Sequence, residues 1–245
     1  MSAEFNLLRL PIYLQKKTSN STDHRPRVAA RRRAEMESRL LSAALHMLAT
    51  KPPRDILVND LVNLEKVSRG TFYKYFDSLG EVYQQLSARL EAELSPIGDH
   101  FVSSIPNAAI RVATGTRLVL NIGSGMPILG KLMLQSGWPM EHSPGIFLAN
   151  LDRDVRLAIK QGSFNQMPES IASNLVVGPM LGGLHSLLAE TCESGSAEQL
   201  TSRILMSLGM TREAATEAVL LPLPEMPMQP TGIIGEIMRL SHAAR

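Results

Sequence analysis

The chain has 245 residues, 44% of them hydrophobic, so it can bury a sizeable core as one large or two small domains. Its single cysteine, Cys192, excludes an internal disulfide and a cysteine-rich metal site, and this suits a reducing cytoplasm. The formal net charge is only +2, but residues 1–76 hold 14 Lys and Arg against 7 Asp and Glu, which favours a nucleic-acid-binding segment at that end.

The fold class follows from the spacing of apolar residues. Spacings of three and four recur throughout the chain, whereas the alternation typical of strands is rare. Aromatic residues make up only 4% while there are 13 Met, in keeping with a core of Leu, Met and Ala. We therefore predict an all-α fold. Because no run of 18 apolar residues occurs, we predict no membrane-spanning helix and no membrane partner.

The first expected segment is a basic arm over residues 1–33. Seven residues from Lys16 to Arg33 are basic and one is acidic, and the segment has no helical periodicity, so we expect disorder there. A helix is expected from about Ala34 to Ala49, where its apolar residues fall on one face, and Pro52 and Pro53 end it.

Three helices are expected next. The first spans about 58–65, the second begins after the capping residue Ser68 and runs through Phe76, and the third ends at Pro96. The residues of these helices that we expect to be buried are Leu61, Val62, Leu64, Phe72, Phe76, Val82, Leu86 and Leu90. The remaining helices are expected near 106–122, 126–136, 144–161, 168–192, 197–208, 211–221 and 232–243, separated by Pro, Gly and Ser clusters.

The most informative stretch is Leu57–Phe76, LVNDLVNLEKVSRGTFYKYF. Two short helices joined by a tight turn can pack on the helix before them and leave the second free to enter the major groove of DNA, which is wide enough for a helix. Phe72 and Phe76, four residues apart, would face inward and the polar residues between them outward. The alternative is a helical hairpin that only packs within the protein. So short a helix buries few residues, however, and packing alone does not account for its polar outward face.

The string VSRGTFYKYF, followed by DSLGEVY and preceded by MESRLLSAALHMLAT, resembles the tetracycline-repressor (TetR) family. The resemblance covers about residues 34–94, and beyond Ser95 it rests only on an all-helical body of the expected length. It implies a helix-turn-helix DNA-binding domain at 34–94, with the motif at 57–76, and a helical domain at 95–245 that binds a ligand and forms a homodimer.

Three positions depart from the pattern of the family. Leu57 stands where the family usually has Thr or Ser, Lys66 where it has Gly in the turn, and Leu79 where it has Lys. A lysine in a turn that prefers a positive φ would cost on the order of 1 kcal/mol, which a contact with a phosphate could recover. These departures concern the phosphate contacts and not the motif itself.

We expect DNA contacts from the arm, the motif helices and the turn between them. Arg69, Thr71 and Tyr73 are placed to contact DNA from the second helix, whereas Lys74 and Tyr75 are expected on phosphate, because positioning contacts outnumber base contacts. The arginines of the arm suit a narrow minor groove or the backbone, the alternative being a solvated run of charge. The full set is Arg31, Arg32, Arg33, Asn59, Lys66, Ser68, Arg69, Gly70, Thr71, Tyr73, Lys74 and Tyr75.

The segment GMPILGK at 125–131 matches the phosphate-loop pattern GxxxxGK. Leu132 follows where the pattern needs Ser or Thr to hold magnesium, Pro127 removes a backbone donor, and no βαβ unit surrounds the segment. We therefore expect a break between two helices, and no enzyme, cofactor or metal site. A nucleotide-binding enzyme that uses this segment remains the alternative from another functional class.

Five apolar residues of the C-terminal part are candidates to line a ligand pocket, although the core is the favoured place for each of them taken singly: Met126, Met133, Trp138, Phe147 and Met180. Gly and Pro breaks at 123–130, 137–145 and 178–183 are expected to leave a cavity between helices. The glycines at 178, 182 and 183 allow close helix packing, either inside the core or at a dimer interface.

These features together predict a cytoplasmic, homodimeric transcriptional repressor. Each protomer would place helix 68–76 in a major groove, so that the dimer recognises an inverted repeat in double-stranded DNA. A small, mostly apolar effector would release the DNA by favouring another dimer geometry. A constitutive DNA-binding protein without a ligand is the remaining alternative.

Overall fold

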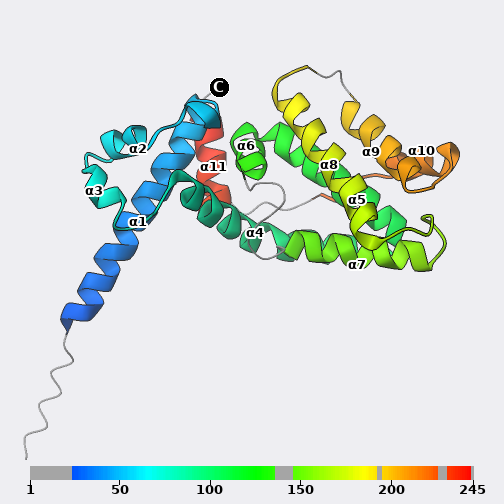
Figure 1. Cartoon of the computed structure of the whole chain (residues 1–245), viewed down its shortest axis with the longest axis horizontal. Helices are drawn as coiled ribbons and strands as arrows, with labels where there is room; N and C mark the ends of the chain where they lie inside the picture. The colour runs from blue at the N-terminus through cyan, green and yellow to red at the C-terminus, as the bar shows by residue number, and fades with distance from the viewer. Residues whose placement is uncertain (1–23, 136–145, 192–194, 226–230, 244–245) are drawn as a thin grey trace, which may run out of the picture. The chain divides into compact units, whose positions relative to one another are not determined.

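The computed structural model describes residues 24–135, 146–191, 195–225 and 231–243. All the regular structure in these ranges is helical, as predicted, and comprises eleven α-helices and one short 3₁₀ helix (Figure 1). Residues 1–36 and 37–245 form separate units. Of the first unit, the structure describes residues 24–36, which begin the first helix.

The N-terminal helices are α1 (His24–Thr50), η1 (Pro53–Asp55), α2 (Val58–Leu64), α3 (Arg69–Phe72) and α4 (Leu79–Ser103). The predicted apolar stripe of α1 is buried, and so is the predicted inward face of α4. The fully or almost fully buried side chains of these helices are Leu40, Leu41, Leu45, Leu48, Leu61, Val62, Phe72, Val82, Leu86 and Leu90. Burial of these apolar side chains stabilises the short helices α2 and α3, which have few backbone hydrogen bonds of their own.

The body of the protein consists of α5 (Ala108–Gly125), α6 (Pro127–Gln135), α7 (Ile146–Lys160), α8 (Glu169–Leu188), α9 (Ser196–Ser207) and α10 (Arg212–Leu220). Helix α5 is central, because it contacts each of the other five. The shared core is built from small and aliphatic side chains, among them Ala113, Leu120, Val155, Val176, Met180, Leu184, Ile204 and Leu205. This agrees with the predicted core of Leu, Met and Ala.

The corner between α5 and α6 depends on two glycines in close contact. A Cβ added at Gly130 would collide with the carbonyl of Gly123, and a Cβ at Gly123 would come within 2.7 Å of Leu184. Glycine at both positions therefore lets α6 fold back against α5. The C-terminal helix α11 (Gly232–Ala243), red in Figure 1, contacts α4 and α6.

Helix α1 begins at His24 and not near Ala34. The expectation of disorder is therefore wrong for residues 24–33. The segment is rich in Ala and Arg, which have high helix propensity. Pro26 lies in the first turn of the helix, where its missing N–H costs no intrahelical hydrogen bond.

Two prolines that we expected to end or break helices lie inside them. Helix α4 continues through Pro96 to Ser103, and α8 runs without a break through Pro179 and the glycines around it. In α8, Val176 and Met180 are buried on either side of the proline, so packing of the apolar face holds the helix together despite the lost hydrogen bond.

Helix α8 is long and apolar enough to cross a membrane by length and composition alone, a test that the core helix of a soluble protein also passes. Sequence analysis did not anticipate such a helix. It packs against α5, α6, α7 and α9, yet only 33% of its most apolar window is buried within the chain. Of its large hydrophobic side chains only Ile171, at 50%, is exposed on the single chain.

Candidate nucleic-acid interface

Helices α2 and α3 and the turn between them form the predicted helix-turn-helix. Ser68 caps α3 as predicted, since its Oγ accepts a hydrogen bond from the backbone N of Thr71 at 3.0 Å. The α-helix ends at Phe72, earlier than predicted. The following amides of Lys74 and Tyr75 donate to carbonyls three residues back, so the chain reaches Phe76 in a tighter turn.

The inward side of this segment is aromatic, as predicted. Phe72 and Phe76 are 0% and 1% exposed, and their ring centroids lie 5.7 Å apart. Leu61 and Val62 are buried in α2, but Leu64, which we also expected to be buried, is 42% exposed. It is the last residue of α2, where the chain turns toward α3.

The outward side of α3 and its following turn is polar and accessible. Arg69, Gly70, Tyr73 and Lys74 are exposed, and Thr71 and Tyr75 are half-buried. The Thr71 hydroxyl lies 2.9 Å from Ser68 Oγ, which orients it. Among the described residues, neither Arg69 nor Lys74 forms an ion pair, so both charges face solvent.

Ion pairs that sequence analysis missed hold both ends of α2 against α1. Lys51 Nζ lies 2.7 Å from Asp60 Oδ1 near the start of α2, and Arg39 Nε lies 2.7 Å from Glu65 Oε2 just after its end. The hydrogen bond from Lys51, with a second from the backbone N of Leu57, lowers the pKa of Asp60. The partners are 9 and 26 residues apart and lie on different elements, so the periodicity of a single helix could not have found them.

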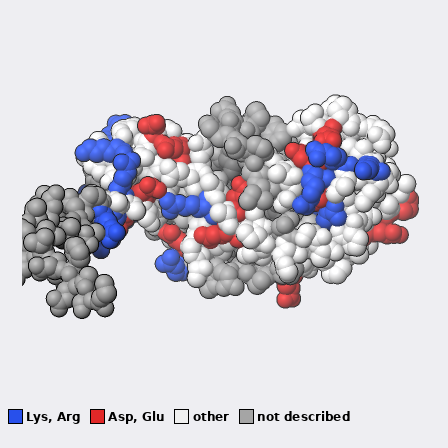
Figure 2. All heavy atoms as spheres, turned by 90° about the horizontal axis from the view of Figure 1, so that it is seen from below, with Lys and Arg blue, Asp and Glu red and all other residues white. Residues whose placement is uncertain are grey.

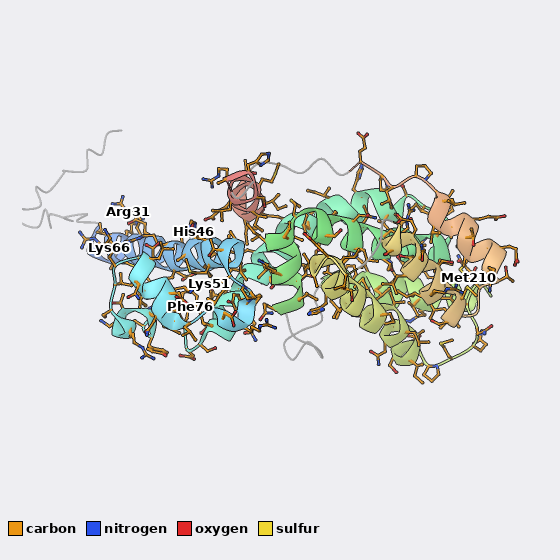
Figure 3. The ribbon with its side chains drawn as sticks, turned by 90° about the horizontal axis from the view of Figure 1, so that it is seen from above. Arg31, His46, Lys51, Lys66, Phe76 and Met210 are labelled. Atoms are coloured by element: carbon orange, nitrogen blue, oxygen red, sulfur yellow. The ribbon has the colours of Figure 1, made fainter. Side chains whose placement is uncertain are left out.

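The turn between the two helices contains the expected strained lysine. Lys66 has φ +55°, in the left-handed region that favours glycine, and its side chain is exposed (Figure 3). Leu57, which precedes α2, is 61% exposed and provides no side-chain cap. Instead the Asp60 carboxylate accepts from the backbone N of Leu57 at 2.8 Å. Asn59 is exposed on α2.

The arginines of the expected arm lie on α1. Arg31, Arg32 and Arg33 are exposed, and Arg31 pairs with Glu35 one turn later, with 3.2 Å between Nε and Oε1. A pair this exposed holds the arginine only weakly. Figure 2 shows Lys and Arg side chains over the body as well as over the N-terminal helices, so basic surface is not confined to the candidate interface.

The five candidate ligand-binding residues lie in different settings. Met180 is 2% exposed in the core, Met133 and Phe147 pack on that core from its edge, and Met126 follows the last residue of α5. Trp138 lies outside the described residues. A surface groove of about 470 Å³ is lined by other residues, Arg156, Ile159, Lys160, Gln166, Met167 and Glu169.

The GMPILGK segment does not form a phosphate loop. Its first glycine ends α5, and Pro127 to Lys131 lie in α6. Lys131 Nζ donates to the carbonyl of Leu48 at the end of α1, at 2.8 Å, and burial lowers the pKa of this lysine. Gly130 is required for the close contact with α5. In the part of the chain that the structure describes, no group of three or more His, Cys, Asp or Glu could hold a metal ion.

Comparison with known proteins gives matches by structure. No protein-family model and no curated protein sequence matches the chain. RolR in complex with resorcinol superposes with a TM-score of 0.65 and 18% identity, over 80% of this chain and 99% of that one. RolR without ligand gives a TM-score of 0.58 and 17% identity, over 77% and 99%.

A Syntrophomonas wolfei protein described as a TetR-family transcriptional regulator superposes with a TM-score of 0.51 and 18% identity, over 78% of this chain and 99% of that one. The chain has the TetR-type fold. The fold that the string VSRGTFYKYF implied is thus confirmed for the described residues. In this TetR-type fold α2, the turn and α3 form the helix-turn-helix, and α5 to α10 form the body.

Proposed function

We propose that this TetR-type chain is a cytoplasmic transcription regulator that binds double-stranded DNA and is not an enzyme. The observation that carries the proposal is the outward face of α3, where Arg69, Tyr73 and Lys74 are exposed above the buried rings of Phe72 and Phe76. The charges of Arg69 and Lys74 have no role in the core, and a short helix displayed in this way fits a major groove.

Within this proposal the contacts divide into two kinds. Arg69 contacts bases, because its planar, forked guanidinium can pair with the edge of a guanine. Lys66 and Lys74 neutralise phosphates and position the helix. The arginines near the start of α1 add further phosphate or minor-groove contacts.

The test is selection of a binding sequence from random double-stranded DNA by the full chain, followed by titration of variants. We expect Arg69→Ala to lose about 1–3 kcal/mol of binding and to relax the sequence preference, whereas Lys74→Ala weakens binding to all sequences alike. Arg54→Ala, an exposed arginine of η1, is the control for loss of charge. Equal binding of wild type and Arg69→Ala to the selected sequence would refute the assignment.

We propose further that the regulator is a homodimer whose interface involves the helices between residues 168 and 221, so that it binds an inverted repeat. Support comes from apolar surface left open on the single chain: Ile171 is 50% exposed on α8, and Leu220 at the end of α10 is 75% exposed. Leu184 is fully buried, so a charge there would unfold the chain and could not test the interface.

Light scattering of Ile171→Glu tests the dimer. We expect a dimer for the wild type and a folded monomer for the variant, because an unpaired carboxylate cannot be buried in an apolar interface without a large cost. Leu64→Glu, an exposed leucine outside the proposed interface, is the control. A wild type that is monomeric at micromolar concentration and binds the selected DNA as a monomer would contradict the proposal.

We also propose that a small, mostly apolar effector binds in the body and releases the DNA, so that the regulator acts as a repressor. RolR, whose body has the same fold, was solved with resorcinol, and Met126, Met133, Trp138, Phe147 and Met180 remain the candidate contacts. Resorcinol and related small phenols form the first panel. An active compound should change the fluorescence of Trp138 and release the selected DNA at matching concentrations. If every compound of a broad metabolite panel leaves both unchanged, the constitutive alternative replaces the repressor.

A further inference from the structure

The C-terminal helix α11 packs on α4 and α6 and not on α10, the helix that precedes it in the chain. We therefore ask what this packing does. One face of α11 is deeply buried: Ile233, Ile234 and Ile237 are 7%, 2% and 0% exposed. The helix contacts α4 and α6, and a hydrogen bond joins it to α1. It therefore touches two helices that flank the helix-turn-helix and one helix of the body.

A single carboxylate of α4 accepts hydrogen bonds from the first turn of α11. Glu93 Oε1 accepts from the backbone N of Ile233 at 2.9 Å, and Oε2 accepts from the backbone N of Ile234 at 3.1 Å. Both amides belong to the first turn, where a helix has no internal partner for them. Gly232 has φ +58°, and a Cβ there would collide with the Glu93 carboxylate. Glycine is thus favoured at this position by its conformation, and a side chain here would displace the Glu93 carboxylate from the two amides.

A second polar contact lies further along α11. The hydroxyl of Ser42 in α1 donates to Glu236 Oε1. On the same region of α1, the Lys131 ammonium of α6 donates to the carbonyl of Leu48 at 2.8 Å. Helix α1 is thus hydrogen-bonded to both α6 and α11, and α11 is hydrogen-bonded to α4. The helices around the helix-turn-helix are therefore connected to the body by side-chain hydrogen bonds as well as by the continuous backbone.

We propose that α11 is a clasp that fixes the orientation of α1 and α4 on the body, and that its docking sets the affinity for the selected DNA. The inference rests on the proposed DNA-binding function. Two reading helices in a dimer bind an inverted repeat tightly only when their spacing is already correct, and a protein that populates other orientations binds more weakly in proportion to the competent fraction. Undocking α11 releases α1 and α4 into such other orientations.

The test uses point variants of the full chain. Gly232→Ala places a Cβ against the Glu93 carboxylate, and Glu93→Gln removes the charge and one of the two acceptors. Gly98→Ala is the matched control, because a Cβ at this glycine of α4 meets nothing within 4 Å. Ser42→Ala removes the contact from α1 and serves as an independent variant should Gly232→Ala fail to fold.

Two measurements are made on each variant. Hydrogen exchange of the backbone amides of α11 reports whether the helix is docked, and titration with the selected DNA and with random-sequence DNA reports binding. We expect protected amides in the wild type and in Gly98→Ala. In Gly232→Ala and Glu93→Gln we expect faster exchange in α11 and about tenfold weaker binding to the selected DNA, a typical size for coupling between sites. Binding to random DNA should stay within about twofold, because it depends on phosphate contacts.

Other outcomes overturn the proposal. If α11 amides exchange faster in the variants while the affinity for the selected DNA is unchanged, the helix does not control binding. If the amides are unprotected in the wild type, there is no clasp. A wild type that selects no DNA sequence removes the proposed function itself, and the clasp falls with it. The first two results, by contrast, leave the DNA-binding function intact.

Discussion

Replacing Lys66 by glycine should separate folding from DNA binding in the turn of the motif. Lys66 has φ +55° and an exposed side chain between α2 and α3, and its amide donates to the carbonyl of Asn63. Lys66→Gly keeps the amide, removes the steric cost of a positive φ, and removes one positive charge from the proposed DNA surface.

Lys66→Gly has two opposing effects on the free energy of unfolding. The left-handed conformation costs a non-glycine residue roughly 1–2 kcal/mol, and the greater freedom of glycine in the unfolded chain takes back about 0.5–1 kcal/mol. The free energy of unfolding should therefore be unchanged or rise by up to about 1.5 kcal/mol. In DNA binding, loss of one phosphate contact should flatten the plot of log K against log salt by about 0.9 in slope.

Urea denaturation followed by circular dichroism measures the first effect, and titration of random-sequence DNA between about 50 and 200 mM salt measures the second. Lys66→Arg keeps the charge and the strain, so it should leave both values near those of the wild type. Lys66→Gly that destabilises the fold by more than about 1 kcal/mol would refute the strain argument. An unchanged salt slope would show that Lys66 does not contact phosphate.

Three further substitutions test other parts of the structure. Ser68→Ala removes the cap of α3 and should lower the free energy of unfolding by about 1 kcal/mol; no change would mean that the cap contributes nothing. Burial raises the pKa of Tyr83 to about 12, and its hydroxyl has no hydrogen-bond partner among the described residues. Tyr83→Phe should therefore stabilise the fold by about 1 kcal/mol. A loss of stability would show that the hydroxyl does have a partner. Asp60→Asn should cost about 0.3–1 kcal/mol at pH 7. Because the pKa of Asp60 is lowered in the folded state, its contribution is present above the unfolded pKa near 3.9 and is lost as the pH falls through the folded value. A difference that does not shrink as the pH falls below about 3.9 would contradict the assignment.

The last of these has a matched control nearby. Asp55 in η1 carries the same charge but is more than half exposed, and its ion pair with Arg54 is long, with 3.9 Å between Nε and Oδ1. Asp55→Asn should therefore change the free energy of unfolding by no more than a few tenths of a kcal/mol at any pH. An equal effect of both substitutions would mean that net charge, and not the bonds of Asp60, determines stability.

Much of the fold was predictable because its signals are local. Helices α5 to α10 begin and end within a few residues of the predicted positions, since Pro, Gly and Ser clusters mark their ends. Within the candidate site, the cap at Ser68, the inward pair Phe72 and Phe76 and the positive φ of Lys66 follow from short-range spacing and from one motif. The structure confirms all three features.

What could not be predicted depends on contacts between distant residues. The amides of Ile233 and Ile234 find their acceptor, Glu93, about 140 residues earlier in the chain, and no periodicity encodes such a pair. Packing also overrides local rules, as in α4, which continues through Pro96. Lys131 resembled the lysine of a phosphate loop because the sequence shows which residue is present but not what it contacts. In the structure its ammonium donates to the carbonyl of Leu48.

Hydroxyl-radical footprinting of the wild-type chain on its selected DNA tests the central claim most directly. If α3 is the reading helix of a homodimer, two protected patches should appear, related by two-fold symmetry and about 34–36 Å apart or a multiple of this distance. At the same protein concentration, Arg69→Ala should weaken both patches together. A single patch, protection without symmetry, or a footprint that Arg69→Ala leaves unchanged would contradict the account.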